Sequence, residues 1–317
     1  MVQHIFKQNI KGQNRVIIEN VTPSLEDGKF PAKRVVHDKF IVNADIFADG
    51  HDVLSAEILY KHENNNNWHR IEMEPLVNDH WEGSFQVDKT GWYTYKVQGW
   101  IDKFKTWYRD TTKKYNADVL TDADFIIGEN IILEILENHK LPKEENASVE
   151  NALKLFESNN IGIEKKIQPV ISGELNEILL KYPVRKFATT SEKELKMICE
   201  HNKAAFSTWY ELFPRSVWND DKEPSGTFKS NIKRLDYVAD LGFDVLYLPP
   251  IHPIGETKRK GKNNSVTAKK GEPGSPWAIG SKEGGHKSIH PELGTLDDFK
   301  VFVNEAKKRN IDIALDV

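Results

Sequence analysis

Residues 230–250 read SNIKRLDYVADLGFDVLYLPP, and this stretch decides the fold class of the C-terminal part of the chain. Its apolar side chains recur at helical spacing over Ser230–Leu241, which predicts a helix with one buried face. Gly242 follows as a C-terminal cap, since glycine readily adopts the left-handed conformation in which many helices end. The apolar run Asp244–Leu248 then predicts a short buried strand that two prolines close.

The same alternation of strand and helix continues on both sides of this stretch. Ser207–Leu212 is a short aromatic and apolar run, which predicts a preceding strand. After a long loop, Thr295 and Asp298 form a T-x-x-D capping box that opens a second helix. Ile311–Val317 predicts a third strand. Short apolar strands that alternate with helices are typical of a parallel sheet covered by helices.

This C-terminal part is short for a complete barrel. It offers three strands and two helices in about 110 residues, whereas a (β/α)₈ barrel takes roughly 250. A three-stranded open sheet would leave Ile311–Val317 as an apolar edge that invites aggregation. We therefore expect residues 206–317 to be the first three units of a truncated (β/α)₈ barrel. The alternative is a small complete α/β domain.

Residues 1–115 have the pattern of an N-terminal β-sandwich. Apolar and polar side chains alternate in several short runs, which is the pattern of half-buried strands. Asp88–Gly91 supplies a turn between two of these runs. The predicted strands are Arg15–Ile18, Phe40–Phe47, Ala56–Tyr60, Trp81–Val87 and Trp92–Trp100.

Residues 116–205 have the pattern of helices, and we expect an inserted helical bundle there. Apolar residues recur at i, i+3, i+4 and i+7, which places one apolar stripe on each helix. Such an insertion can also serve as an oligomer contact. The predicted helices lie around Asn130–His139, Val149–Phe156, Leu175–Tyr182 and Glu192–Lys203.

The composition excludes several classes of protein. The net charge of the 317 residues is −4, which argues against a dedicated nucleic-acid binder. Cys199 is the one cysteine, so a scaffold stapled by internal disulfides is excluded. No apolar run reaches the ~20 residues that a membrane span needs, and Met1–Gly12 lacks the apolar core of a signal peptide. We expect a cytoplasmic protein with no membrane partner.

Several motifs from Trp209 onward carry a resemblance to a known family. They are WYELFPRS at 209–216, LGFDVLYLPPIHPIG at 241–255, RKGKNN at 259–264, GSPWAIGS at 274–281, LGT at 293–295 and ALDV at 314–317. This series resembles the α-amylase superfamily and, within it, the α-1,4-glucan:maltose-1-phosphate maltosyltransferases. In the N-terminal part, Arg34, Asp45, Phe47–Asp52, Trp100 and Trp107 fit the same family.

The resemblance implies an enzyme that moves a maltosyl unit from α-maltose 1-phosphate to an α-1,4-glucan and releases phosphate. The implied mechanism is a retaining double displacement through two carboxyl groups. In this superfamily the catalytic carboxylates follow the fourth, fifth and seventh strands, so we expect none of them in this chain. The resemblance implies no cofactor and no metal, and its helical insertion implies a homodimer.

Two alternatives remain open. One is an amylase-type glucan hydrolase or a branching enzyme, although Ser288-Ile289 stands where many amylases have a tyrosine. The other is that the isolated chain is a non-catalytic glucan-binding or dimerisation fragment. Five of the eight tryptophans lie between Trp68 and Trp107 and could bind glucan, but most are expected to form the sandwich core.

The long loop after Pro250 holds the candidate substrate-binding residues. Residues 255–272 are rich in lysine and arginine, which suits a sugar phosphate because cationic groups hydrogen-bond both hydroxyls and phosphate. From composition alone, a solvated loop with incidental charge is the more favoured interpretation. By resemblance, Lys260 is the donor-binding lysine and Asn264 is the nearby asparagine of the family.

Expectations also follow for a tryptophan, an aspartate and three histidines of this region. Trp277 either stacks on a sugar or anchors the loop, and anchoring is slightly favoured. Asp316 corresponds to the aspartate that opens the first conserved amylase region, with a positional role expected. The histidines His252, His286 and His290 lack metal-ligand spacing.

Overall fold

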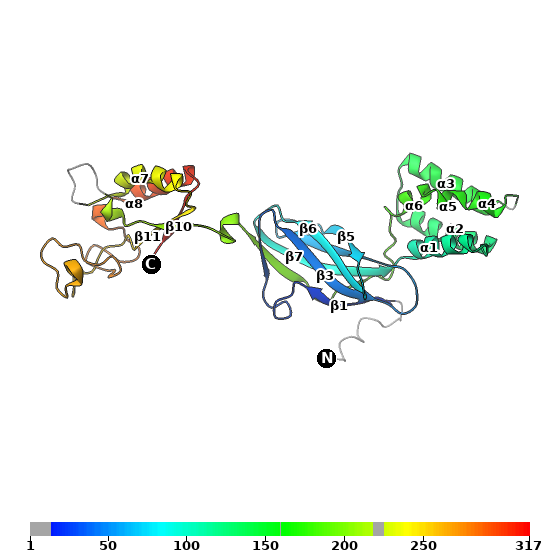
Figure 1. The fold of residues 1–317 in the computed structure, drawn as a ribbon, viewed down its shortest axis with the longest axis horizontal. Helices are drawn as coiled ribbons and strands as arrows, with labels where there is room; N and C mark the ends of the chain where they lie inside the picture. Colours follow the sequence, from blue (N-terminus) through cyan, green and yellow to red (C-terminus); the bar gives the residue numbers. More distant parts are fainter. Residues whose placement is uncertain (1–13, 159, 218–224) are drawn as a thin grey trace. The chain divides into compact units, whose positions relative to one another are not determined.

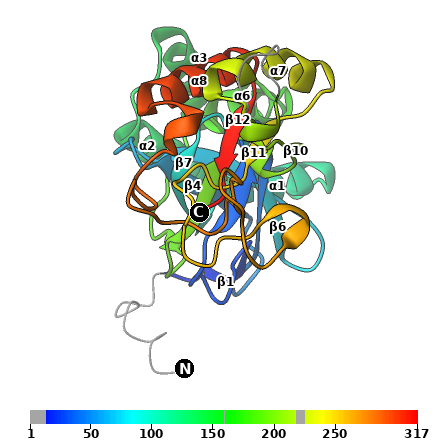
Figure 2. The ribbon, with the colours of Figure 1, turned by 90° about the vertical axis from the view of Figure 1, so that its left-hand side faces the viewer.

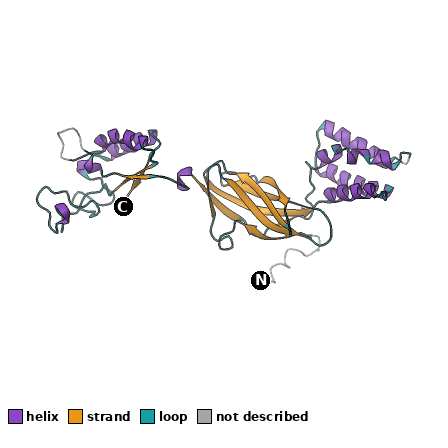
Figure 3. Cartoon of the chain, in the orientation of Figure 1, coloured by secondary structure: helices purple, strands orange, loops and turns teal. Residues whose placement is uncertain are grey.

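The computed structural model describes residues 14–158, 160–217 and 225–317 of the chain. The chain divides into two compact units, Met1–His201 and Asn202–Val317, and each is described by itself below. The first contains a strand-rich part and a helical part, and the second contains both strands and helices (Figures 1 and 3).

Nine strands of the first unit form a sheet that folds over itself. The strand order is β1-β3-β6-β5-β4-β7-β9-β2, with β8 beside β7. β5 pairs with β4 along most of its length but with β6 only through Glu74 and Pro75, so it joins two layers at one corner. The strands are β1 (Ile17–Thr22), β2 (Ala32–Val35), β3 (Lys39–Phe47), β4 (Leu54–His62), β5 (His69–Pro75), β6 (His80–Gln86), β7 (Gly91–Ile101), β8 (Thr189–Thr190) and β9 (Leu195–Glu200).

The core between the two layers follows the alternation seen in the sequence. Along β3 every second side chain is buried, beginning with Phe40. The Phe40 ring packs against those of Phe85 and Tyr95, with ring centroids 5.3 and 5.0 Å apart. The Trp81 indole is buried in the same core and donates a hydrogen bond to the Ile46 carbonyl. The structure thus confirms the predicted strands that correspond to β1, β3, β4, β6 and β7; β2 and β5 were not predicted.

The helix predicted over Glu192–Lys203 is wrong, because this segment contains strand β9. Leu195, Met197 and Cys199 alternate in burial along it and join the sandwich core. β9 pairs antiparallel with β7 and parallel with β2. Leucine, methionine, lysine and glutamate favour helices, but pairing with two neighbouring strands overrides that preference.

Six helices of the first unit pack around a second apolar core. The predicted stripe from Val149 to Phe156 is buried in α3, and Leu175, Ile178 and Leu179 are buried in α6. One departure is α1, which begins at Lys103 inside the part expected to be β. The helices are α1 (Lys103–Asn116), α2 (Asp122–Asn138), α3 (Lys143–Glu157), α4 (Ile163–Lys166), α5 (Gln168–Ile171) and α6 (Glu174–Leu179).

Glycine at position 128 permits the close packing of α1 against α2. The Trp107 ring lies across this glycine, and a Cβ atom at Gly128 would come within 2.2 Å of its Cζ2. The Trp107 indole also donates a hydrogen bond of 2.8 Å to the Asp124 carbonyl. Among the described residues, no helix combines the length and apolarity that a membrane crossing requires.

The second unit is a three-stranded parallel sheet with order β10-β11-β12 (Figure 2). This confirms the predicted parallel pairing. Gly242 has φ +81° after the end of α7, and the Thr295–Asp298 capping box opens α8, both as predicted. The elements are β10 (Trp209–Glu211), α7 (Phe228–Asp240), β11 (Val245–Leu248), α8 (Leu296–Lys308) and β12 (Asp312–Leu315).

Candidate functional site

The candidate site lies where the long loop leaves the carboxyl end of β11. Parallel α/β folds place their functional loops at this end of the sheet. The loop forms a narrow neck, because the Gly280 amide donates to the Pro253 carbonyl at 2.8 Å and the Gly255 amide donates to the Ala278 carbonyl. Residues 256–277 project between these two arms, and we call them the basic lobe.

Lys260 and Asn264 both lie on the basic lobe and are both exposed. Asn264 ends a short 3₁₀ turn, Lys262–Asn264, with φ +61°. Within the described part of the chain, neither side chain makes a hydrogen bond or ion pair. The structure therefore brings the two candidate residues onto one lobe and leaves both side chains free to meet a ligand.

The backbone of the basic lobe is held by contacts within the loop. The Ala268 amide donates to the Arg259 carbonyl at 2.9 Å, and the Gly261 amide donates to the Ser265 carbonyl at the same distance. A Cβ atom at Gly261 would lie 2.7 Å from the Thr267 carbonyl oxygen, so this close approach needs glycine. The lobe is thus a folded substructure.

Arg259 is a residue that the sequence reasoning did not single out. Its side chain turns back to the neck, where Nε donates to the Gly255 carbonyl and Nη2 donates to the Ile254 carbonyl, both at 2.8 Å. The signal available in the sequence was its place beside Lys260 in the RKGKNN motif. Only the loop backbone shows that its partners are carbonyl groups of its own loop.

Asp316 joins β11, β12 and the long loop at the carboxyl edge of the sheet. It follows β12, and its Oδ2 accepts hydrogen bonds of 2.6 Å from the Tyr247 hydroxyl and from Trp277 Nε1. These two donors lower the pKa of the Asp316 carboxyl below its ordinary value, Tyr247 more than Trp277. The same carboxylate raises the pKa of Tyr247 to about 12.

Trp277 uses its polar edge to hold the loop, yet leaves about half of its surface open. Besides the bond to Asp316, its ring packs edge-on against Phe213, with centroids 5.7 Å apart. The side chain is 51% exposed. This geometry favours the loop-anchoring interpretation and still leaves about half of the residue exposed.

A second charged group is the pair of Arg215, which follows β10, and Glu292, which lies at the end of the long loop. Arg215 donates from Nη1 to Glu292 Oε2 at 2.6 Å. Its Nη2 is buried and has no hydrogen-bond partner among the described residues. Burial, and then the positive charge of Arg215, lowers the pKa of the nearby His290. Arg215 is therefore a half-buried cation that pairs with Glu292 and keeps one guanidinium nitrogen without a hydrogen-bond partner in the part of the chain that the structure describes.

Two of the three loop histidines, His252 and His290, make local hydrogen bonds, and the ring of His286 lies near that of His252. His252 Nδ1 lies 2.9 Å from the Ser288 carbonyl, and His290 accepts from the Glu292 amide. Among residues 14–158, 160–217 and 225–317, no group of three His, Cys, Asp or Glu side chains is arranged to hold a metal ion. The expectation of a metal-free site stays a prediction.

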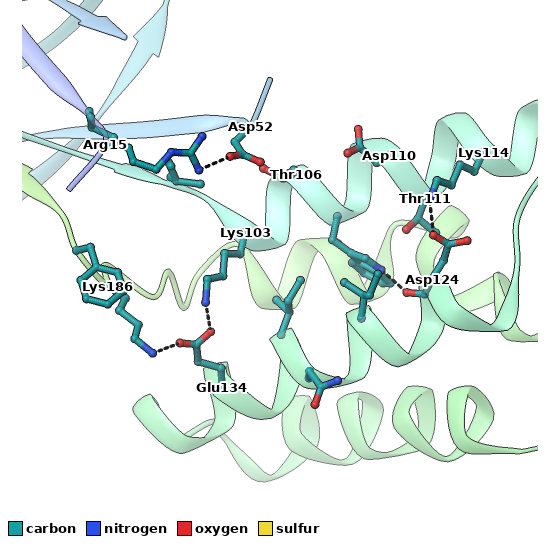
Figure 4. Close-up of a pocket in the computed structure, with 17 residues that line it drawn as sticks. Arg15, Asp52, Lys103, Thr106, Asp110, Thr111, Lys114, Asp124, Glu134 and Lys186 are labelled. Carbon is teal, nitrogen blue, oxygen red and sulfur yellow. Dashed lines mark hydrogen bonds and ion pairs between the residues drawn. The ribbon is translucent and has the colours of Figure 1, made fainter. Parts of the chain in front are cut away.

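The first unit contains a cavity of about 680 Å³ between the sandwich and helices α1 and α2 (Figure 4). Apolar side chains such as Trp107 and Phe187 line it. Its charged side chains are all in ion pairs, including Arg15 with Asp52 and Lys103 with Glu134. Neither Lys260 nor Asn264 lines this cavity, and each of its charged side chains is already paired with another side chain.

The chain matches two family models. Residues 14–201 match the model described as alpha-1,4-glucan:maltose-1-phosphate maltosyltransferase, domain N/S, and residues 211–317 match the alpha amylase catalytic domain. These matched ranges fall within the two compact units of the structure. The motifs of the basic lobe lie inside the second range.

Individual relatives agree with these models. The chain is 42% identical over 306 residues to an alpha-1,4-glucan:maltose-1-phosphate maltosyltransferase of Chlorobaculum tepidum, which covers 96% of this chain and 45% of that protein. A relative with the same name in Methylacidiphilum infernorum is 41% identical, and the match covers 97% of this chain and 45% of that protein. Another in Myxococcus xanthus is 38% identical, and the match covers 95% of this chain and 46% of that protein. The chain thus spans somewhat less than half the length of these relatives, and it belongs to the alpha-1,4-glucan:maltose-1-phosphate maltosyltransferase family.

Proposed function

We propose that the whole protein carrying this chain transfers a maltosyl unit from α-maltose 1-phosphate to the non-reducing end of an α-1,4-glucan and releases phosphate. The observation that carries this proposal is the basic lobe, which presents the unpaired Lys260 at the carboxyl edge of a parallel sheet. A cation that has no protein partner can pair with the donor phosphate. The names of the relatives also support it.

The proposed reaction retains the anomeric configuration by double displacement. A carboxylate attacks the anomeric carbon and expels phosphate, and the glucan hydroxyl then takes the maltosyl unit from the enzyme. We place these carboxyl groups in residues beyond Val317, so this chain would contribute donor binding and not the nucleophile. Three parallel strands and the longer span of the relatives support the view that the barrel continues.

Within the part described, we assign Lys260 to the donor phosphate and Asn264 to the hydroxyl groups of the donor. Both are exposed on the same lobe, and an amide can donate to one hydroxyl while it accepts from another. We also propose that the whole protein is a cytoplasmic homodimer. Sedimentation of the whole protein tests the dimer, and cell fractionation tests its location.

Product analysis tests the proposed reaction. The whole protein is incubated with α-maltose 1-phosphate and maltohexaose, and both phosphate release and the glucan mass are followed. Phosphate release matched by growth in steps of two glucose units supports the proposal. Reducing sugar formed from glucan without added maltose 1-phosphate would instead support the hydrolase alternative, and new branch points would support a branching enzyme.

A further inference from the structure

Arg259, which precedes Lys260 in the sequence, holds the base of the basic lobe in place. Arg259 donates from Nε and Nη2 to the carbonyls of two consecutive residues, Gly255 and Ile254, at 2.8 Å each. Ile254 is buried and forms an isolated bridge with Ile279 on the returning arm. The guanidinium therefore attaches to a part of the loop that is buried and paired with the returning arm.

Arg259 also contacts the lobe and its returning arm. The Arg259 carbonyl accepts a hydrogen bond of 2.9 Å from the Ala268 amide, which connects Arg259 to the middle of the lobe. A Cβ atom at Gly274 would lie 2.8 Å from Arg259 Cγ, so the arginine stem packs directly on that backbone. Gly274 has φ +80°, a conformation that glycine adopts without strain. One residue thus joins the neck, the lobe and the returning arm.

The position of Lys260 depends on this arrangement, because no contact of the lysine side chain holds it in place. Its side chain is exposed and makes no hydrogen bond or ion pair with any described residue. The position of the Lys260 side chain is therefore set by the Lys260 backbone, which is joined to Arg259 by one peptide bond. A binding group held in place before the ligand arrives loses less conformational entropy on binding.

We propose that Arg259 is a positioning residue that holds Lys260 in place for the phosphate of the donor substrate. This inference rests on the proposed function, since it assumes that Lys260 binds maltose 1-phosphate. Arginine suits the role because its rigid planar fork can donate to two neighbouring carbonyls, whereas the single ammonium of lysine has a different geometry. Arg259 acts through Lys260 and needs no contact with the substrate.

A double-mutant cycle in the whole enzyme tests the proposal. Arg259→Gln is expected to raise the KM for maltose 1-phosphate about tenfold or more and to change kcat by less than about threefold. In the Lys260→Ala background the same substitution should have little further effect on KM, because the group that it positions is absent. Lys270→Ala serves as the control, since Lys270 is an exposed lysine of the same lobe that makes no hydrogen bond or ion pair with the described residues.

Arg259→Lys separates positioning from a direct electrostatic contact. The lysine keeps the positive charge but loses the planar pair of donors, so the KM for maltose 1-phosphate should remain as high as in Arg259→Gln. If Arg259→Lys restores the KM, or if the effects of Arg259→Gln and Lys260→Ala multiply in the double variant, the positioning role is overturned. A normal KM in Arg259→Gln overturns it as well.

A structural readout keeps this inference distinct from the proposed function. In Arg259→Gln the amide of Ala268 should exchange with solvent about tenfold faster, while the amides of β11 stay protected. Unchanged exchange at Ala268 contradicts the inference even if the KM rises. An enzyme that releases no phosphate from maltose 1-phosphate overturns the proposed function. A Lys260→Ala variant with a normal KM refutes the role of Lys260 and, with it, that of Arg259.

Discussion

Trp277 and Asp316 are joined by a hydrogen bond of 2.6 Å from the indole Nε1 to Oδ2, although 39 positions separate them in the chain. This contact attaches the long loop to the end of β12. Because the neck and the basic lobe belong to the same loop, the hydrogen bond links the candidate donor-binding residues to the sheet.

Removing the indole donor should loosen the neck. Trp277→Phe keeps an aromatic ring beside Phe213 but cannot donate to Asp316. We expect the Gly280 amide, which donates to the Pro253 carbonyl, to exchange with solvent about three- to tenfold faster. Trp209→Phe is the control, because it removes an indole that donates to the nearby Ser207 and keeps an aromatic ring beside Tyr247. Equal exchange in the wild type and Trp277→Phe would refute the anchoring role.

The stability of the second unit should fall in acid, partly through Asp316. Hydrogen bonds from Tyr247 and Trp277 lower its folded pKa below the ordinary value of 3.8. Its contribution is therefore complete above about pH 4 and is lost as the pH falls through the lowered folded pKa. Asp316→Asn should weaken the dependence of the urea midpoint on pH below pH 4. A variant with the same acid dependence as the wild type would show that the carboxylate makes no such contribution.

A buried carboxylate in the sandwich should be important for the stability of the first unit. Glu57 is 3% exposed and pairs with both Arg70 and Arg185. Glu57→Gln removes its charge and should lower the free energy of unfolding by about 1–3 kcal/mol, measured by urea denaturation. The control is Glu72→Gln, whose partner is Lys105 on the surface and whose loss should cost less than about 1 kcal/mol. Equal losses in the two variants would contradict this account.

The packing of α1 on α2 should not tolerate a methyl group at position 128. Gly128→Ala places a Cβ atom against the Trp107 ring and should lower the free energy of unfolding by about 1–3 kcal/mol. This loss opposes the gain of about 1 kcal/mol that alanine usually brings to a helix. Gly162→Ala has no atom within 4 Å of the new Cβ and should be nearly neutral. A stabilised Gly128→Ala variant would mean that the two helices can move apart at little cost.

Local signals predicted much of the fold. The Thr295–Asp298 capping box and the Gly242 cap involve residues close together in the chain, so sequence spacing is sufficient to find them. Strand β9 was missed because its stability comes from β7 and β2, which are distant in the sequence. The helix α1 was missed for a different reason: its signals are local, with Asp102 as N-cap and Phe104 and Trp107 on the buried face, but it follows directly from the long strand β7.

The site was only partly accessible from sequence. Family motifs pointed to Lys260, and the structure adds that this lysine is exposed on a folded lobe. The role of Arg259 could not be predicted, because its partners are backbone carbonyls that any residue type supplies. Likewise, nothing in the spacing of Tyr247, Trp277 and Asp316 indicated that one carboxylate would join them.

The proposed binding of the donor phosphate by Lys260 is best tested by the KM of the Lys260→Ala variant of the whole enzyme. We expect the KM for maltose 1-phosphate to rise about tenfold or more, since a charge-assisted hydrogen bond contributes about 1.5–3 kcal/mol, while the KM for the glucan acceptor stays unchanged. Lys270→Ala should leave both values unchanged. An unaltered KM for maltose 1-phosphate in Lys260→Ala would show that Lys260 does not bind the donor.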